Sequence, residues 1–466
     1  MLVSADPETL DPRYTTDAVG LRITRLVHAG LIRLDADTLE PRPYVAKGWR
    51  WLDPLTLEVT LREDVRFHPS GAPVRAHDVA ETLRAFASSR VASRHARVVE
   101  AIAEVREEGE HTVVVRLARP HATLLTDLEL PVLRAEQAWL PPSPDGGALD
   151  GLGPFALAHV ARGEVDLTPA DGGALSRPAH GVTLRTVHDE NARVLRLEAG
   201  GADVALNLVS PTLLPALAAD PSLAVTSRAG ANLTYIVVQE ERAALADRRV
   251  REALSLGIDR SLLCRTLFDG RAQPAADLVA PSHWAHADAP PLPFDPARAR
   301  ALLEASGHGR LHLTLLTSTD RLRVDVARTM AQGLDAEGVE VEVIPLELGT
   351  MIARLNAGEF DLAVLQLPEM TEPNVLRHFL HGDFVPPAGA NRGRVHDAEI
   401  DALLDLGDRA AGLDARRAVY ARLEARQREE MHLIPLFYED QVAVTSRRAR
   451  AFVPSAEGRW LGLSAL

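Results

Sequence analysis

Thr56-Leu-Glu-Val-Thr-Leu61 and the residues that follow it carry the clearest structural pattern in this sequence. Apolar residues occupy the odd positions of the hexapeptide and polar residues the even positions, which is the period of a strand with one buried face. Pro69-Ser-Gly71 predicts a break, because proline lacks an N–H donor and glycine tolerates a positive φ. Val79, Leu83 and Phe86 then recur at helical spacing. The stretch therefore predicts a strand, a turn and a short helix.

Four blocks of this region, Asp53–Asp64, Val65–His68, Gly71–Val74 and Asp78-Val79, occur in the order of a known signature. They resemble family 5 extracellular solute-binding proteins, the peptide and nickel receptors of ABC importers. One departure is Arg75, where family members usually have a Thr or Ser helix cap. Arginine cannot accept the unpaired N–H groups of a helix start, so we expect this start to be weaker by about 1 kcal/mol.

Length and composition narrow the class of protein. A chain of 466 residues exceeds one ordinary core and predicts two or three domains. The aromatic content of 4% argues against a sugar-stacking cleft or an aromatic nucleic-acid surface. The net charge of −14 disfavours binding to phosphate backbones and to anionic membranes. We therefore expect no nucleic-acid partner.

Cys264 is the only cysteine, which excludes an intrachain disulfide and predicts a small core residue. The sequence contains no run of about 18 apolar residues, so no transmembrane helix is expected. The first residues, Met1 to Pro7, lack the basic and apolar regions of a signal peptide. Either a leader was removed before Leu2 or the protein is a cytoplasmic relative. We favour removal, which implies a periplasmic or cell-surface protein, with or without a lipid anchor.

A second stretch, Asp247–Arg260, is close to the family's Asp-x-x-Val-Arg-x-Ala-Leu-x-x-x-Ile-Asp-Arg. Val250, Leu254 and Ile258 recur every four residues and predict one apolar helical stripe. We interpret the flanking charges, Arg251 and Asp259 among them, as helix caps and solvated ion pairs. None of them is expected to be catalytic.

The order of elements in the second half predicts a parallel sheet. Leu311–Leu316 and Val339–Ile344 have strand patterns, and Arg321–Leu334 between them has a helical one. A strand, helix, strand order implies a right-handed crossover and a parallel pair. The apolar run Leu233–Val238 predicts a strand buried on both faces.

In the first half, the apolar spacing from Leu21 to Leu31 predicts a helix closed by Gly30. Pro41 and Pro43 are interpreted as a linker.

The resemblance implies an α/β, two-lobed periplasmic-binding-protein-like fold with an inserted domain and two hinge crossings. It places lobe I at residues 1–38, 151–237 and 439–466, the inserted subdomain at 39–150, and lobe II at 238–438. Gly151-Leu-Gly-Pro-Phe155 is similar to the family's turn that returns from the inserted domain.

A ligand anchor is expected after the strand Phe360–Leu365, because ligands collect at the carboxyl ends of strands in open α/β sheets. The segment Gln366–Pro373 resembles the family's stretch in which an aspartate, three residues before a Glu-Pro or Asp-Pro pair, holds the α-ammonium of a peptide. Glu369 occupies that place here, before Glu372-Pro373. Glutamate is one methylene longer than aspartate, and the aromatic residue that often precedes the anchor is missing. The alternative is a solvent-facing loop glutamate.

Asn391-Arg-Gly-Arg394 resembles the family's segment with a cleft-facing asparagine. Arg392 and Arg394 could hold a ligand carboxylate bidentately, or lie in a surface loop. The expected ligand-binding residues are therefore Glu369, Gln366, Asn391, Arg392 and Arg394.

Two histidine pairs, His283/His286 and His378/His381, have spacings that could bind metal if helical, but neither has a third ligand beside it in the sequence. We expect no resident metal and no cofactor. The chain also lacks the Gly-x-Ser-x-Gly, His-Glu-x-x-His and Gly-x-x-x-x-Gly-Lys motifs, so we expect no enzyme activity.

The sequence predicts the receptor of an ABC importer that closes two lobes over an oligopeptide or a similar small cationic or zwitterionic solute. Its expected partners are that ligand and the membrane permease, and the receptor is expected to be a monomer. The alternatives are a cytoplasmic ligand-sensing regulator, a nickel-chelate-binding receptor and a hydrolase. No helix-turn-helix or basic segment precedes Asp6, which weighs against the regulator.

Overall fold

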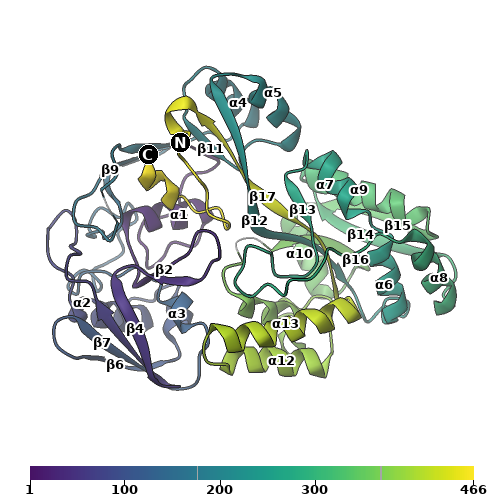
Figure 1. The fold of residues 1–466 in the computed structure, drawn as a ribbon, viewed down its shortest axis with the longest axis horizontal. Helices are drawn as coiled ribbons and strands as arrows, with labels where there is room; N and C mark the ends of the chain where they lie inside the picture. The colour runs from purple at the N-terminus through teal and green to yellow at the C-terminus, as the bar shows by residue number, and fades with distance from the viewer. Residues whose placement is uncertain (176, 368–369) are drawn as a thin grey trace. The chain divides into compact units, whose positions relative to one another are not determined.

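The computed structural model describes residues 1–175, 177–367 and 370–466, which form two compact units. The first unit contains Met1–Arg228 and Gln441–Leu466, and the second contains Ala229–Asp440. The chain passes from the first unit to the second within strand β12 (Leu223–Val238) and returns within β17 (Leu433–Ser446) (Figure 1). The finer boundaries expected for the two lobes and the inserted subdomain stay predictions.

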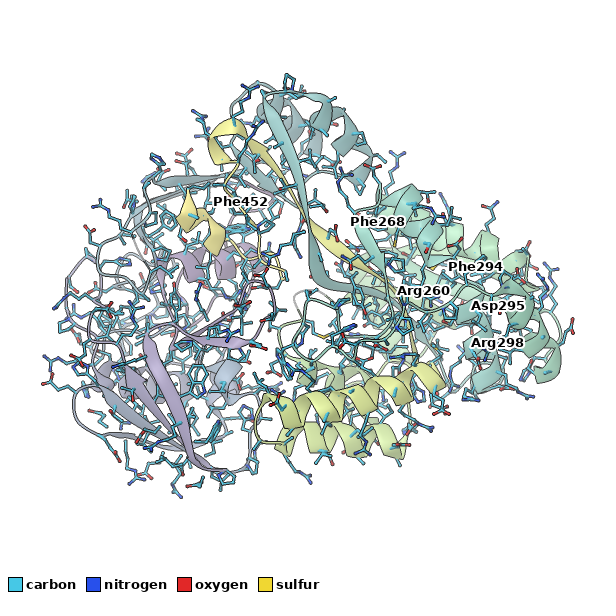
Figure 2. The ribbon with its side chains drawn as sticks, in the orientation of Figure 1. Arg260, Phe268, Phe294, Asp295, Arg298 and Phe452 are labelled. Atoms are coloured by element: carbon cyan, nitrogen blue, oxygen red, sulfur yellow. The ribbon has the colours of Figure 1, made fainter. Side chains whose placement is uncertain are left out.

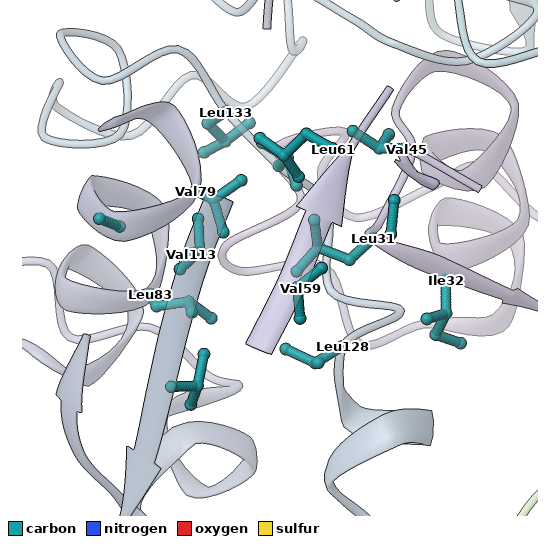
Figure 3. Packing of buried hydrophobic residues seen from close by; sticks show 14 of the residues in the cluster. Leu31, Ile32, Val45, Val59, Leu61, Val79, Leu83, Val113, Leu128 and Leu133 are labelled. Atoms are coloured by element: carbon teal, nitrogen blue, oxygen red, sulfur yellow. The ribbon is translucent and has the colours of Figure 1, made fainter. Parts of the chain in front are cut away.

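One antiparallel sheet of the first unit contains Thr56–Leu61, whose alternating pattern predicts a strand with one buried face. Its strand order is β4 (Ala46–Asp53), β5 (Thr56–Leu61), β7 (Thr112–Leu117) and β6 (Ile102–Glu107). Leu57, Val59 and Leu61 of β5 are buried, as the alternation predicts. Helix α2 (Ala76–Ala87) buries its apolar residues in the same core, and Figure 3 shows Val79 and Leu83 beside Val113 of β7.

Helix α2 begins without a side-chain cap, as predicted for Arg75. The carboxylate of Asp78, in the first turn, accepts a hydrogen bond from the backbone N–H of Arg75 at 2.9 Å. Burial raises the pKa of Asp78. This bond satisfies the N–H of the residue before the helix. The N–H of Asp78 donates to the backbone carbonyl oxygen of Arg75 at 3.0 Å, so the Arg75 backbone, and not its side chain, accepts a bond at this helix start.

A second sheet of the first unit has its own core. Its strand order is β1 (Leu2–Val3), β10 (Val182–Thr186), β9 (Glu164–Pro169) and β8 (Phe155–Ala161). Phe155 packs there with residues of α1 (Ala18–Val27) and with Phe452, which is labelled in Figure 2. This unit also contains α3 (Leu124–Asp127), α4 (Glu190–Glu198), α5 (Leu214–Ala219) and β11 (Val204–Leu206).

Two local predictions in this unit were wrong. Pro41 and Pro43 do not form a linker: Pro41–Pro43 is strand β3, paired with β2 (Ile32–Leu34). A two-stranded sheet consists only of edge strands, where the missing proline N–H does not interrupt a second ladder. Helix α1 ends at Val27 rather than at Gly30. Gly30 instead forms a β-bridge with Pro131. A Cβ atom on residue 30 would collide with the backbone of Glu129, so this position requires glycine.

The second unit is built on a mixed sheet with the strand order β11, β17, β12, β16 (Leu362–Leu367), β14 (Leu311–Ser318) and β15 (Val339–Leu346). Strand β13 (Ala272–Pro274) also pairs with β17, and β11 belongs to the first unit. Strand β14 is parallel to both β15 and β16, which confirms the predicted parallel pair. The helices are α6 (Arg248–Leu256), α7 (Arg260–Leu267), α8 (Pro296–Ser306), α9 (Arg321–Asp335), α10 (Leu348–Ala357), α11 (Leu376–Leu380), α12 (Ala398–Arg409) and α13 (Leu413–Glu430). Cys264 of α7 is buried, as expected.

The stretch Asp247–Arg260 contains two helices rather than one. Asp247 caps α6 and Asp259 caps α7. The cap at Asp259 confirms the interpretation of that charge. Arg251, however, is not solvated: it is 2% exposed and donates hydrogen bonds to the carbonyl oxygens of Leu245 and Glu430. Buried carbonyl groups outside regular ladders need donors, and a long guanidinium supplies several.

Arg260 is also buried, in contrast to Arg298 of α8, which is exposed (Figure 2). Its guanidinium donates to the carbonyl oxygens of Pro435 and Ser255, at 2.8 Å in both cases. Burial lowers the pKa of Arg260 to about 9. Arginine–carbonyl bonds thus connect the start of α7 to β17.

Candidate functional site

The carboxyl ends of parallel strands in the second unit bring several polar side chains to one edge of the sheet. Strand β14 ends at Ser318 and β16 at Leu367, and α9 begins directly after β14. Strand β12 is antiparallel to β16, and its Thr234 lies opposite Gln366. Thr234 therefore joins Gln366 at the edge where ligands collect in open α/β sheets.

Three residues from distant parts of the chain bond to one another at this edge. Arg323, in the first turn of α9, donates to Glu439 Oε1 at 2.5 Å and to Thr234 Oγ1 at 3.0 Å. Thr234 Oγ1 donates in turn to the same Glu439 oxygen at 2.9 Å. The side chains of Arg323 and Glu439 are 18% and 20% exposed, so both remain reachable from solvent.

Thr234, Arg323 and Glu439 were not predicted from the sequence as ligand-binding residues. For Arg323 a signal exists, because a charged residue in the first helical turn after a buried strand lies at the carboxyl edge. The sequence around Thr234 and Glu439 gives no such signal, because the pairing of distant strands brings these two residues to the carboxyl edge. An arginine that already has a carboxylate partner can exchange it for a ligand anion at small cost only if both are partly solvated.

The expected anchor, Glu369, and its neighbour Pro368 lie outside the described residues. Leu367 pairs with Leu233 of β12. Glu372 accepts two hydrogen bonds from Arg416 of α13, at 2.9 and 2.5 Å.

One of the other expected ligand residues, Arg394, lies apart from Gln366. Arg394 forms an ion pair with Glu241 at 3.1 Å, and the N–H of Glu240 donates to the carbonyl oxygen of Gly393. Both acidic residues follow the end of β12, which is opposite the amino-terminal end of β16, whereas Gln366 is at its carboxyl end. Arg394 and Gln366 are therefore at opposite ends of one strand.

Arg392 and Asn391 have defined partners within the fold. Arg392 donates to Asn356 Oδ1 at 3.0 Å, and burial lowers its pKa. Asn391 is fully buried, and its amide bonds to the backbone of His381 and Val395. Asn391 thus holds its own loop together.

The two histidine pairs have different surroundings. His283 Nδ1 accepts from the N–H of Ala285, and His286 Nδ1 donates to the carbonyl oxygen of Val279. His381 Nδ1 accepts from the N–H of Asp383. Across the described ranges, no group of three His, Cys, Asp or Glu side chains is arranged to hold a metal ion.

A family profile for bacterial extracellular solute-binding proteins, family 5 (middle part), matches residues 40–382. The chain belongs to this family. The match includes Gln366, Thr234 and Arg323 of the carboxyl edge and ends before Glu439. The resemblance carried by Asp53–Asp64 and Asp247–Arg260 is thereby confirmed.

Relatives of this family 5 protein cover nearly its whole length. The "Probable di/tripeptide-binding protein 5" of Pseudomonas aeruginosa is 25% identical over 464 residues, which cover 92% of this chain and 88% of that protein. Among solved structures, the periplasmic binding protein DppA from Helicobacter pylori in complex with the peptide STSA has a TM-score of 0.76 at 19% identity and covers 99% of this chain and 96% of its own. NikA from Brucella suis in complex with Fe(III)-EDTA has a TM-score of 0.85 at 21% identity and covers 99% and 98%. These structures confirm the predicted α/β, two-lobed periplasmic-binding-protein-like fold.

Within residues 1–175, 177–367 and 370–466, no helix combines the length and the apolar character that crossing a membrane requires.

Proposed function

We propose that this family 5 protein is the receptor of an ABC importer and binds a short peptide or a similar small cationic or zwitterionic solute. The family match over residues 40–382, together with a di/tripeptide-binding relative that covers 92% of the chain, carries this proposal. The family name describes solute binding, and we assign no catalytic step to the protein. The partly solvated polar edge with Gln366, Thr234, Arg323 and Glu439 supports the proposal, because it offers donors and acceptors to a polar solute.

In the proposed complex, Glu369 pairs with the ligand's ammonium group and Gln366 lies beside it at the carboxyl end of β16. Arg392 and Arg394 remain candidates for the ligand carboxylate. The five steps from Leu362 to Leu367 span roughly 17 Å at about 3.3 Å per residue, whereas a dipeptide spans roughly 7 Å. A dipeptide held at Gln366 is therefore too short to place its carboxylate at Arg394. If Arg394 holds the ligand carboxylate, the ligand is a longer peptide.

The permease of the importer is the proposed protein partner, and the proposed location is the periplasm or the cell surface, with or without a lipid anchor. DppA from Helicobacter pylori, a structural relative, is a periplasmic binding protein. The net charge of −14 supports a monomeric receptor without a nucleic-acid partner. The NikA complex with Fe(III)-EDTA makes a metal chelate the second candidate ligand.

Mass spectrometry of the gently purified protein tests the ligand class. We expect a co-purified peptide, and calorimetry with dipeptides and tripeptides should then give binding with one site per chain. A parallel metal analysis is the control. A stoichiometric metal with no bound peptide would contradict the peptide assignment and favour the chelate.

Ligand binding is expected to reduce the radius of gyration measured by small-angle X-ray scattering. Because the chain passes between the two units only within β12 and β17, a hinge rotation there requires changes at few residues. The Glu369→Gln variant at the same peptide concentration is the control and should keep the radius of the free protein. An unchanged radius in the parent protein at saturating ligand would contradict hinge closure.

A further inference from the structure

Two buried carboxylates of the second unit share a single cationic partner. Glu424 of α13 is 0% exposed and Asp277 is 2% exposed. Asp277 Oδ1 accepts hydrogen bonds from Arg428 Nε at 3.0 Å and from Arg428 Nη2 at 2.6 Å. Within the described ranges, the carboxyl group of Glu424 forms no ion pair of its own. If both carboxylates were ionised, the cluster would therefore bury one negative charge without a cation, which is a costly arrangement.

The segment 277–279 is bonded to two different elements at this cluster. Glu424 Oε2 accepts from the N–H of Leu278 at 3.0 Å, and Glu424 Oε1 accepts from the N–H of Val279 at 3.2 Å. From the other side, the hydroxyl group of Tyr438 in β17 donates to the carbonyl oxygen of Asp277 at 2.7 Å. The segment is therefore held between α13 and β17, the strand within which the chain returns to the first unit.

Two acceptor oxygens at the cluster lack a hydrogen-bond donor. Asp277 Oδ2 and Gln427 Oε1 are both buried, and neither has a partner in the part of the chain that the structure describes. Asp277, Gln427 and Glu424 line one narrow cavity, in which no position is wide enough for a water molecule. A water molecule therefore cannot supply the missing donor.

One proton on Glu424 removes both deficits. The protonated carboxyl group is neutral, so Asp277 is balanced by Arg428, and its O–H is a donor in the cavity that Asp277 Oδ2 and Gln427 Oε1 line. Its oxygens keep lone pairs for the two backbone N–H groups. Burial, and after it the charge of Asp277, raise the pKa of Glu424 to about 8, while the two N–H groups and Arg428 act in the opposite direction.

We propose that Glu424 carries a buried proton at neutral pH and that this proton holds residues 277–279 between α13 and β17. The proposal does not depend on the identity of the solute. Among the described residues, the charged or titratable groups that face this carboxyl are Asp277, Arg428 and Tyr438. Asp277 and Arg428 form a charged pair, and burial raises the pKa of Tyr438, so its hydroxyl group stays neutral.

The direction of the pH dependence follows from linkage. An acid whose pKa is higher in the folded than in the unfolded state stabilises the fold fully below the unfolded value, and this contribution is lost as the pH rises to the folded value. For Glu424 the loss extends from about pH 5 to about pH 8.

Urea unfolding of the full chain at pH 5 and pH 8 tests the proposal with Glu424→Gln, which is neutral at both values and has N–H donors. The unfolding equilibrium constant of the parent should rise tenfold or more relative to that of Glu424→Gln between the two pH values. Glu429→Gln is the matched control, because Glu429 is on the same helix and 58% exposed, and it should follow the parent within about twofold. Parallel pH profiles for Glu424→Gln and the parent overturn the proposal.

Amide hydrogen exchange of the parent keeps the test decisive if Glu424→Gln does not fold. The amides of Leu278 and Val279 donate to Glu424, so their exchange between pH 5 and pH 8 should rise with pH more steeply than base catalysis alone produces. The amides of β7, in the first unit, are the reference and should follow base catalysis. Equal pH dependence at residues 278–279 and in β7 overturns the proposal.

Discussion

The Glu369→Gln variant is expected to bind its peptide about 30- to 5,000-fold more weakly than the parent, a loss of about 2–5 kcal/mol. Glutamine keeps the shape of glutamate and removes its charge. The ligand's ammonium group would then be buried without an anionic partner, which is the costly arrangement in a closed site. Calorimetry with the co-purified peptide measures the loss.

Glu359→Gln is the matched control, because Glu359 is an exposed glutamate that precedes β16 at the end opposite Gln366. It should bind within about twofold of the parent, since an exposed charge contributes about 0–1 kcal/mol. Both variants should unfold at the denaturant concentration of the parent. If Glu369→Gln binds within about threefold of the parent, less than 1 kcal/mol, then Glu369 is a loop residue and the ammonium anchor lies elsewhere.

The Arg251→Met variant is expected to lose about 3–5 kcal/mol of unfolding free energy. Arg251 is buried and donates to three carbonyl groups, of Leu245, Ala246 and Glu430. Its guanidinium also lies 3.6 Å from Glu240 and 3.5 Å from Glu430 carboxylate oxygens. Methionine fills much of the volume but provides no donor. The carbonyl groups belong to the backbone and cannot be removed with the arginine, so they remain buried and unpaired.

Urea unfolding measures this loss as a shift of the transition midpoint at constant slope. Arg248→Met is the matched control, because Arg248 is in the same helix, is 46% exposed and pairs with the exposed Glu429 at 3.5 Å. It should change stability by less than about 0.5 kcal/mol. Equal midpoints for the two variants would contradict a structural role for the buried arginine.

The candidate site shows where prediction from sequence stops. Gln366 was predicted from a local pattern, a buried strand followed by polar residues. Thr234 and Arg323 are 89 residues apart in the sequence, Arg323 and Glu439 are 116 apart, and Thr234 and Glu439 are 205 apart. No short stretch of sequence therefore contains any two of them. The resemblance grouped Arg394 with Gln366, whereas the register of β12 and β16 puts them at opposite ends of the strand.

The sequence by itself determined the family, β5 and α2, the parallel strands β14 and β15, and the cap Asp259. Each depends on contacts between residues two to four positions apart, or on motif order, and both are readable along the chain. Only the tertiary structure decided that Arg251 is buried, that Pro41–Pro43 is a strand, and that Arg416 holds Glu372. The physical reason is that burial and pairing depend on which distant segments meet, and a charged or proline residue accepts either environment when its partners are present.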